Sequence, residues 1–247
     1  MDFTIELAEM KIAISALYDT TKDYCKGYWT EGAADFFVTI SPDDIIDERK
    51  RSARQDARDG IPTRQFSDSY MEILAVYRKI AEQMIWHDTL LFHGSVVAVD
   101  GVGYMFTALS GTGKSTHTRL WREYFGDRAV MVNDDKPLLE VTENGVLACG
   151  TPWSGKHRIN TKINVPLKAI CILEQGEKNS IVPVTAMEAM PILLEQSHRP
   201  ADRMGLIRYL DLIEQIVSKV GLYRLRCNME PEAAIVSYYG MRGKEIE

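Results

Sequence analysis

The sequence has few of the features that mark specialised classes of protein. Its 247 residues include only four cysteines, which stand far apart and form no CxxC pair. This excludes a disulfide scaffold, and the paired ligand spacing of a zinc site is absent. No apolar run approaches the roughly 18 residues of a membrane span. The first residues carry acids and no basic region before an apolar stretch, so we expect a cytoplasmic protein with no membrane partner.

An excess of positive charge is also missing. The net charge is −6, from 29 basic and 35 acidic residues. An acidic chain repels nucleic acid unless its basic residues gather on one face, so we expect no nucleic-acid partner. The apolar content of 45% and the charged content of 26% are average for a globular protein. The chain is long enough for one large domain or two small ones.

The patterning along the chain indicates two parts. Strand patterns come first, at residues 3–7, 11–16 and 34–40. Residues 47–65 are then dense in charge, with Gly and Pro near the end, which is typical of a solvated linker. The basic residues of this segment could instead dock a phosphate or an acidic partner. We expect a small, β-rich α+β addition over residues 1–65 and a catalytic domain over residues 66–247.

The second part mixes hairpins with strand–helix units. Asp100-Gly101 and Asn144-Gly145 each separate two apolar runs, which predicts two β-hairpins. Thr185 and Glu188 form a capping-box pattern before a helix. Further helices are expected over residues 67–88, 115–125, 201–220 and 231–240, the last three closed by Gly126, Gly221 and Gly240. These elements together predict an α/β fold in which helices pack on a mixed β-sheet.

The sharpest motif is ALSGTGKST at residues 108–116, which fits the phosphate-loop pattern with Ala108 in place of the first glycine. Gly111 and Gly113 would let the backbone wrap a phosphate chain at the N-terminus of the next helix. Lys114 would reach the β- and γ-phosphates and the Ser115 hydroxyl would ligate Mg²⁺. An ordinary turn would leave Lys114 unexplained. We expect the nucleotide contacts to be Ser110, Gly111, Thr112, Gly113, Lys114, Ser115 and Thr116.

A pair of carboxylates follows the loop, in the motif VNDD at residues 132–135. An apolar strand that ends in Asp134 and Asp135 places acids where phosphoryl transfer needs them. One carboxylate can hold Mg²⁺ and the other can take the proton of an attacking hydroxyl. Adjacent carboxylates resist ionising together, so we expect one raised pKa. Taken alone, the motif could equally be a turn with two solvated acids.

Histidines form a third group of candidates. His93 stands directly before the first hairpin. The hairpin returns the chain, so the start of its first strand lies near the end of its second, where the loop begins. We therefore expect His93 close to the bound phosphates. His87 and His117 are weaker catalytic candidates.

Cationic side chains supply the last candidates, in the segment CGTPWSGKHR at residues 149–158. Lys156 and Arg158 could neutralise phosphate or grip the substrate. Trp153 could stack on a base or a substrate, or could be a buried residue of a plain surface loop. Arg199 is a weaker candidate for stabilising charge, together with its neighbours His198 and Arg203.

The order of these motifs resembles the catalytic domain of HPr kinase/phosphorylase, in the phosphoenolpyruvate carboxykinase-like group of phosphate-loop enzymes. That order is His93-Gly94, a hairpin, the loop, a helix, and a strand ending in Asp134-Asp135. The resemblance is specific over residues 91–136 and extends to about residue 175. Two features depart from the family: GTPWSGK replaces a Gly-rich stretch with a metal-binding Glu, and the first ninety residues do not resemble the family's N-terminal domain.

The resemblance implies a mixed-sheet kinase domain that transfers phosphate from ATP, with Mg²⁺, to a hydroxyl group that is typically a serine. His93, Lys114, Asp134 and Asp135 occupy the catalytic positions, with Asp135 as the base and Asp134 beside the metal. The acceptor would be a peptide, protein or small molecule other than HPr. The family also implies a homo-oligomer. The alternatives are a nucleotide-binding regulatory protein without phosphoryl transfer and a carboxykinase-like enzyme.

Overall fold

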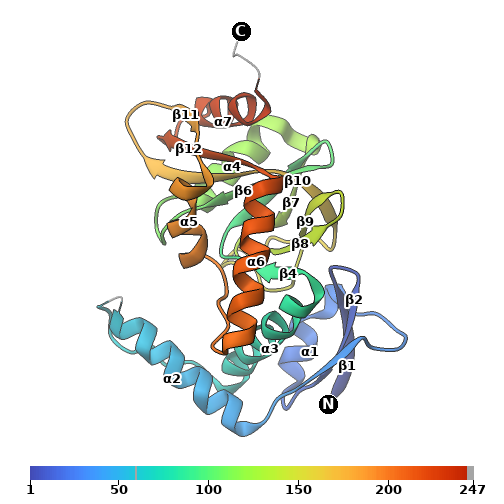
Figure 1. Ribbon diagram of the computed structural model, residues 1–247. Coiled ribbons are helices and arrows are strands. Elements are labelled where there is room, and N and C mark those ends of the chain that lie inside the picture. Colours follow the sequence, from blue (N-terminus) through green and yellow to red (C-terminus); the bar gives the residue numbers. More distant parts are fainter. Residues whose placement is uncertain (59, 244–247) are drawn as a thin grey trace. The chain divides into compact units, whose positions relative to one another are not determined.

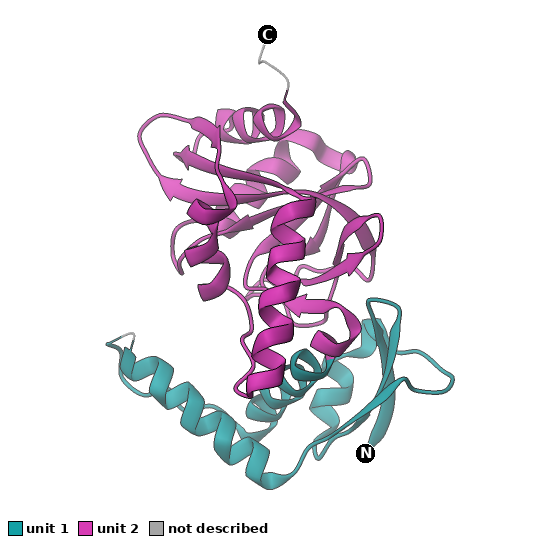
Figure 2. Ribbon diagram, in the orientation of Figure 1, with its two compact units in different colours: residues 1–83 teal, residues 84–247 magenta. Residues whose placement is uncertain are grey.

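A computed structural model describes residues 1–58 and 60–243. The chain forms two compact units, Met1–Gln83 and Met84–Glu247 (Figure 2). This division falls later than the boundary expected between residues 65 and 66. The helix expected over residues 67–88 is present as α3 (Asp68–Met84) and the one-turn helix η2 (Ile85–His87), and α3 lies almost wholly in the first unit.

The first unit carries a three-stranded sheet with helices (Figure 1). Its strands are β1 (Asp2–Leu7), β2 (Met10–Ser15) and β3 (Phe36–Thr39), so the alternating patterns are confirmed. The first two strands form an antiparallel hairpin, and β3 runs parallel to β2. Two short helices, α1 (Asp19–Tyr24) and η1 (Lys26–Tyr28), connect β2 to β3, and α2 (Pro42–Arg58) follows. The unit therefore combines a small sheet with helices, and its helices hold more residues than its strands, which is not the β-rich composition expected over residues 1–65.

The charged segment over residues 47–65 is a solvated connection only in its last part. Helix α2 extends through it to Arg58, whereas residues 60–65 are exposed and lie outside helices and strands. Two acids of α2 are buried and each is bound by an arginine. Arg78 donates to both Glu48 oxygens at 2.7 and 2.8 Å, and Arg64 donates to Asp56 Oδ1 at 2.9 and 2.7 Å. Forked arginine pairs of this kind satisfy carboxylates that would otherwise be costly to bury.

The second unit is built on a nine-stranded mixed sheet. Its main path has the order β4-β8-β9-β10-β6-β5-β7, and β12 and β11 continue from β10. The strands are β4 (Thr89–Leu91), β5 (Ser95–Val99), β6 (Val102–Thr107), β7 (Ala129–Asn133), β8 (Leu138–Thr142), β9 (Gly145–Cys149), β10 (Asn164–Gln175), β11 (Ser180–Pro183) and β12 (Gly221–Cys227). The first part of β10 pairs antiparallel with β9, and the rest pairs parallel with β6 and β12. The long strand β10 therefore joins both halves of the sheet.

Helices cover both faces of this sheet (Figure 1). Alternate residues of one strand belong to different cores: Val96 and Ala98 of β5 to one, Val97 and Val99 to the other. Since successive strand residues point to opposite faces, the two cores lie on opposite sides of the sheet. One contains residues of α5 (Ala186–Glu195) and α6 (Arg203–Lys219), the other residues of α4 (Lys114–Phe125) and α7 (Glu232–Arg242).

The local signals of the second unit are mostly confirmed. Both predicted hairpins form, and the Thr185–Glu188 capping box is present. Gly126 follows α4, with the one-turn helix η3 (Gly126–Arg128) after it. Gly240, however, does not close α7, which continues to Arg242. A Cβ at Gly240 would lie 2.2 Å from Cγ2 of Ile181, so this glycine allows close packing and does not end the helix.

Within residues 1–58 and 60–243, no helix combines the length and the apolar character that crossing a lipid bilayer requires.

Candidate active site

The motif at residues 108–116, here called the glycine loop, joins the end of β6 to α4. Gly111 and Gly113 have φ values of 81° and 118°, a region that other residues rarely adopt. A Cβ at either position would meet nothing within 4 Å, so the requirement for glycine is conformational and not steric. The Thr112 amide donates to the Leu109 carbonyl at 3.3 Å and closes the turn.

Lys114 is the first residue of α4 and is only 9% exposed. Its Nζ donates to the Ala108 carbonyl at 2.9 Å and to the Leu109 carbonyl at 3.4 Å. The ammonium group is therefore folded back over the first residues of the glycine loop. Burial lowers its pKa, and the negative charge of Asp135 opposes that shift.

Asn133, the last residue of β7, organises the turn that carries the two carboxylates. Its side-chain oxygen accepts from the amides of Asp135 and Lys136 at 2.8 and 2.6 Å. Its Nδ2 donates to the carbonyls of Thr151 and Trp153 at 2.9 and 3.3 Å. Sequence reasoning assigned Asn133 no role. The available signal was that asparagine commonly bonds the backbone two residues ahead in turns.

Asp134 is 6% exposed and is held from two directions. Its Oδ1 accepts from the Gly155 amide at 2.6 Å, and its carbonyl accepts from the Ser95 hydroxyl at 2.9 Å. Burial raises the pKa of Asp134, the Gly155 amide opposes this, and the charge of Asp135 adds to the rise. One pKa of the pair is raised, as expected, but burial contributes more than the neighbouring carboxylate.

His93 and Asp135 form a close pair, with His93 Nε2 lying 3.1 Å from Asp135 Oδ1. The backbone fixes this geometry: the Gly94 amide donates to the Asp135 carbonyl at 3.0 Å, and the His93 amide donates to the Gln196 carbonyl at 2.6 Å. The hairpin also ties His93 to β6, because the Thr107 hydroxyl donates to its carbonyl at 3.2 Å. His93 therefore lies close to the start of the glycine loop, as the hairpin predicted.

The electrostatics of this pair favour an ionised carboxylate beside a neutral imidazole. Burial lowers the pKa of His93, and its bond to Asp135 only partly opposes this. Burial also raises the pKa of Asp135. The His93 bond and the charges of Lys136 and Lys114 outweigh that effect and hold the pKa below its usual range. Lys136, whose Nζ lies 3.7 Å from Asp135 Oδ1, is a cation that sequence reasoning missed.

The segment with the other predicted cations lies beside Asp134. Lys156 and Arg158 are both exposed. The Arg158 amide donates to the Gly155 carbonyl at 2.8 Å, so the turn with Arg158 holds the glycine that binds Asp134. The charge of His157, another residue that sequence reasoning missed, acts on Asp134. Arg199 is exposed and lies three residues beyond Gln196, whose carbonyl binds His93.

Two expectations are corrected by burial. Trp153 is 4% exposed, so its ring cannot stack on a ligand and the buried alternative holds. His117 is 2% exposed, and its Nε2 lies 3.0 Å from the Ser237 hydroxyl. Burial lowers the pKa of His117 to about 3, so it is a core residue and no catalytic group. His87 precedes β4, which is separated from β6 by three strands in the sheet order.

A ready-made metal cluster is not part of this site: no group of three or more His, Cys, Asp or Glu side chains gathers among the described residues. Mg²⁺ does not need one, because it is usually held by one or two carboxylates together with water and phosphate oxygens. Ser115 in the first turn of α4 and the buried carboxylate of Asp134 are donors of the right chemistry.

Fold and site together define a mixed α/β protein with a buried lysine and a histidine–carboxylate pair near a glycine loop. Residues 62–232 match the family described as SynChlorMet cassette protein ScmC, and the chain belongs to this family. No curated protein matches the chain. A solved structure of the Hpr(Ser) kinase/phosphatase from Coxiella burnetii is 12% identical over 62% of this chain and 88% of that one. Its TM-score of 0.37 is too low to define a shared fold.

Proposed function

We propose that this protein is a kinase that uses ATP and Mg²⁺ to phosphorylate a hydroxyl group of a peptide, protein or small molecule. The observation that carries the proposal is the grouping of an ionised, histidine-bound Asp135 with the buried Lys114 of the glycine loop. A base for the hydroxyl and a cation for the phosphates are the two groups that phosphoryl transfer needs from a protein.

The glycine loop is suited to phosphates. Its amides and the N-terminus of α4 provide donors and a favourable dipole for an anion. Lys114 now binds the carbonyls of Ala108 and Leu109. We infer that it exchanges these neutral acceptors for the β- and γ-phosphates. Ser110 to Thr116 would then surround the phosphate chain.

The metal would be held by the Ser115 hydroxyl and Asp134, directly or through water. A metal ion held there would supply positive charge that neutralises the transferring phosphoryl group. The exposed cations Lys156, Arg158 and Arg199 are the candidates for further contacts with phosphate.

Asp135 would act as the base. Its oxygen takes the proton of the acceptor hydroxyl as the new oxygen–phosphorus bond forms and the bond from the γ-phosphorus to ADP breaks. His93, donating through Nε2, would orient the carboxylate. The lowered pKa of Asp135 keeps it ionised at neutral pH, so it is ready to accept a proton before the acceptor arrives.

The test is transfer from γ-labelled ATP to a pool of serine, threonine and tyrosine peptides and small alcohols. We expect label in an acid-stable ester on an acceptor, formed with Mg²⁺ and not with excess chelator. Hydrolysis to free phosphate with no labelled acceptor in the whole pool would contradict the proposal and favour a nucleotide-sensing protein. Decarboxylation of oxaloacetate coupled to ATP would favour the carboxykinase-like alternative.

A further inference from the structure

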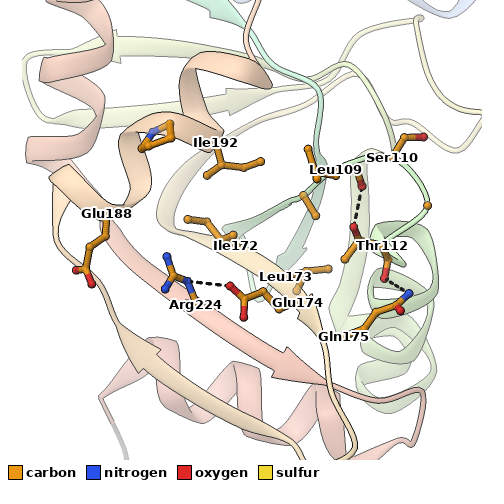
Figure 3. Close-up of a pocket in the computed structure, with 13 residues that line it drawn as sticks. Leu109, Ser110, Thr112, Ile172, Leu173, Glu174, Gln175, Glu188, Ile192 and Arg224 are labelled. Atoms are coloured by element: carbon orange, nitrogen blue, oxygen red, sulfur yellow. Dashed lines mark hydrogen bonds and ion pairs between the residues drawn. The ribbon is translucent and has the colours of Figure 1, made fainter. Parts of the chain in front are cut away.

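A pocket of about 660 Å³ borders the glycine loop on its β10 side, whereas Asp134 and Asp135 follow β7, on the other side of β6 in the sheet order. Its lining comes from the loop, the end of β10, one side of α5 and Arg224 of β12. Figure 3 shows Leu109, Ile172 and Ile192 around one common space. This volume is within the range of sites that enclose small ligands. The pocket shares Ser110, Gly111 and Thr112 with the proposed phosphate contacts, but the kinase proposal assigns no role to its apolar wall.

The charges around the pocket are already paired. Glu174 lies 3.2 Å from Arg224 and 3.8 Å from Arg226. Glu188 accepts from the amide and the hydroxyl of Thr185 at 2.8 and 2.7 Å, as part of the capping box. Because both carboxylates already have partners, the pocket favours an apolar group over a cation.

The pocket borders the terminal-phosphate end of the nucleotide site. Ala108 and Leu109 line it, and the carbonyls of these two residues hold Lys114 Nζ. In phosphate loops the lysine contacts the β- and γ-phosphates. The helix N-terminus belongs to α4, which packs on the opposite face of the sheet from α5. The phosphoryl acceptor approaches the terminal phosphate, so it can reach the apolar wall of this pocket that lies beyond the phosphate contacts.

Helix α5 connects the pocket to the proposed base. Ile192 lines the pocket, and one turn later the Gln196 carbonyl binds the His93 amide. Four helical residues rise about 6 Å, and an extended peptide spans about 3.5 Å per residue. The backbone of His93 is therefore about two extended residues from that of Ile192, so a short peptide can span from the pocket to the side chains of His93 and Asp135.

We propose that this pocket binds an apolar side chain of the phosphate acceptor, one or two residues from the hydroxyl that is phosphorylated. The inference deepens the proposed function and rests on it for the identity of the occupant as an acceptor. It predicts that substrates are chosen by an apolar residue at a fixed distance from the hydroxyl.

The test measures binding and needs no phosphoryl transfer. Fluorescent pentapeptides with a central serine carry alanine at the flanking positions, or one leucine at each flanking position in turn. Binding to the full chain is followed by anisotropy with Mg²⁺ and a non-hydrolysable ATP analogue present. We expect one leucine register to bind about tenfold more tightly than the alanine peptide, the scale set by burying one apolar side chain.

Two variants locate the binding site. Ile192→Arg puts a charge into the pocket and should abolish the leucine preference. Met187→Arg makes a similar change on the same helix, at an 85% exposed residue that does not line the pocket, and should keep it.

Equal binding of all peptides by the wild-type protein would overturn the proposal, and this comparison does not depend on any variant folding. The same titration is repeated without the ATP analogue. A leucine peptide that binds only when the analogue is left out would also overturn the proposal and would assign the pocket to the nucleoside. If the leucine preference holds while no acceptor in the whole pool of peptides and small alcohols is labelled, the kinase proposal fails and the apolar peptide site remains.

Discussion

The two sides of the glycine loop offer different chemistry. Toward β5 and β7 lie His93 and Asp135, partly exposed, within the electrostatic influence of Lys114. Toward β10 and α5 lies an apolar pocket whose neighbouring charges are paired with one another. The comparison teaches how one loop can separate the proposed reaction from recognition: the titratable pair of His93 and Asp135 lies on one side, and the apolar pocket on the other.

Lys114→Met is expected to have the largest effect on the polar side of the glycine loop, the side with His93 and Asp135. The substitution keeps much of the side-chain volume and removes the charge that would contact the phosphates. We expect transfer to fall about 1,000-fold, as for loss of a transition-state charge contact, and ATP affinity to fall as well. Equilibrium binding of a fluorescent ATP analogue and label transfer check both. Lys168→Met, at an exposed lysine of β10, is the control, and unchanged ATP affinity in Lys114→Met would argue against the assignment.

Asn133→Ala tests how the polar side is supported. The change removes the buried side-chain oxygen that now accepts from both the Asp135 and the Lys136 amides. We expect the free energy of unfolding to fall by about 3 kcal/mol, measured by chemical denaturation, with transfer reduced as the turn relaxes. Asn164→Ala, at an exposed residue, should change stability little. A variant as stable as the wild type would show that Asn133 does not hold the turn.

His93→Gln tests whether His93 orients the proposed base, Asp135, which the substitution leaves in place. We expect transfer to fall about 10- to 100-fold, the size of one charge-assisted hydrogen bond. Because His93 holds the pKa of Asp135 down, its loss should raise that pKa. A base works only when ionised, so the pH below which activity is lost should move upward. The pH dependence of transfer is measured for this variant and for His87→Gln as the control. If activity is lost below the same pH in His93→Gln as in the wild type, His93 does not act on Asp135.

His117 is expected to give the smallest of these effects, a change in the pH dependence of folding stability. Unlike His93, it lies in the core and takes no part in the site. Burial gives it a pKa of about 3, whereas an unfolded histidine titrates near 6.5. Below pH 6.5 the unfolded chain binds a proton that the folded chain does not. Stability should therefore fall by about 1 kcal/mol between pH 6.5 and 5.5 from this residue. Denaturation of His117→Gln at both pH values should lack this component, and an unchanged pH dependence would contradict the buried neutral state.

Local signals in the sequence predicted much of the fold and the polar side of the site. Asp100-Gly101 and the Thr185–Glu188 box act over a few residues and formed as expected. The glycine loop and the Asp134-Asp135 turn are also short motifs. The approach of His93 followed from a single hairpin, which is the simplest long-range inference a sequence allows.

The remaining features depend on partners that are distant in the sequence. Glu48 is buried because Arg78, from another helix, binds it, so the charged segment looked like a linker when read alone. Trp153 became a core residue through its place in the fold. The pocket joins Leu109, Ile172 and Ile192 from a loop, a strand and a helix, and no local pattern could bring these residues together.

The most direct test of the account is Asp135→Asn, with ATP affinity and label transfer measured on the same preparation. The change removes the base and leaves the glycine loop intact, and Asp127→Asn at an exposed acid is the control. We predict a fall in transfer of about 100-fold or more, with ATP affinity within about twofold of the wild type. Undiminished transfer, or a loss of ATP affinity as large as the loss of transfer, would contradict the account.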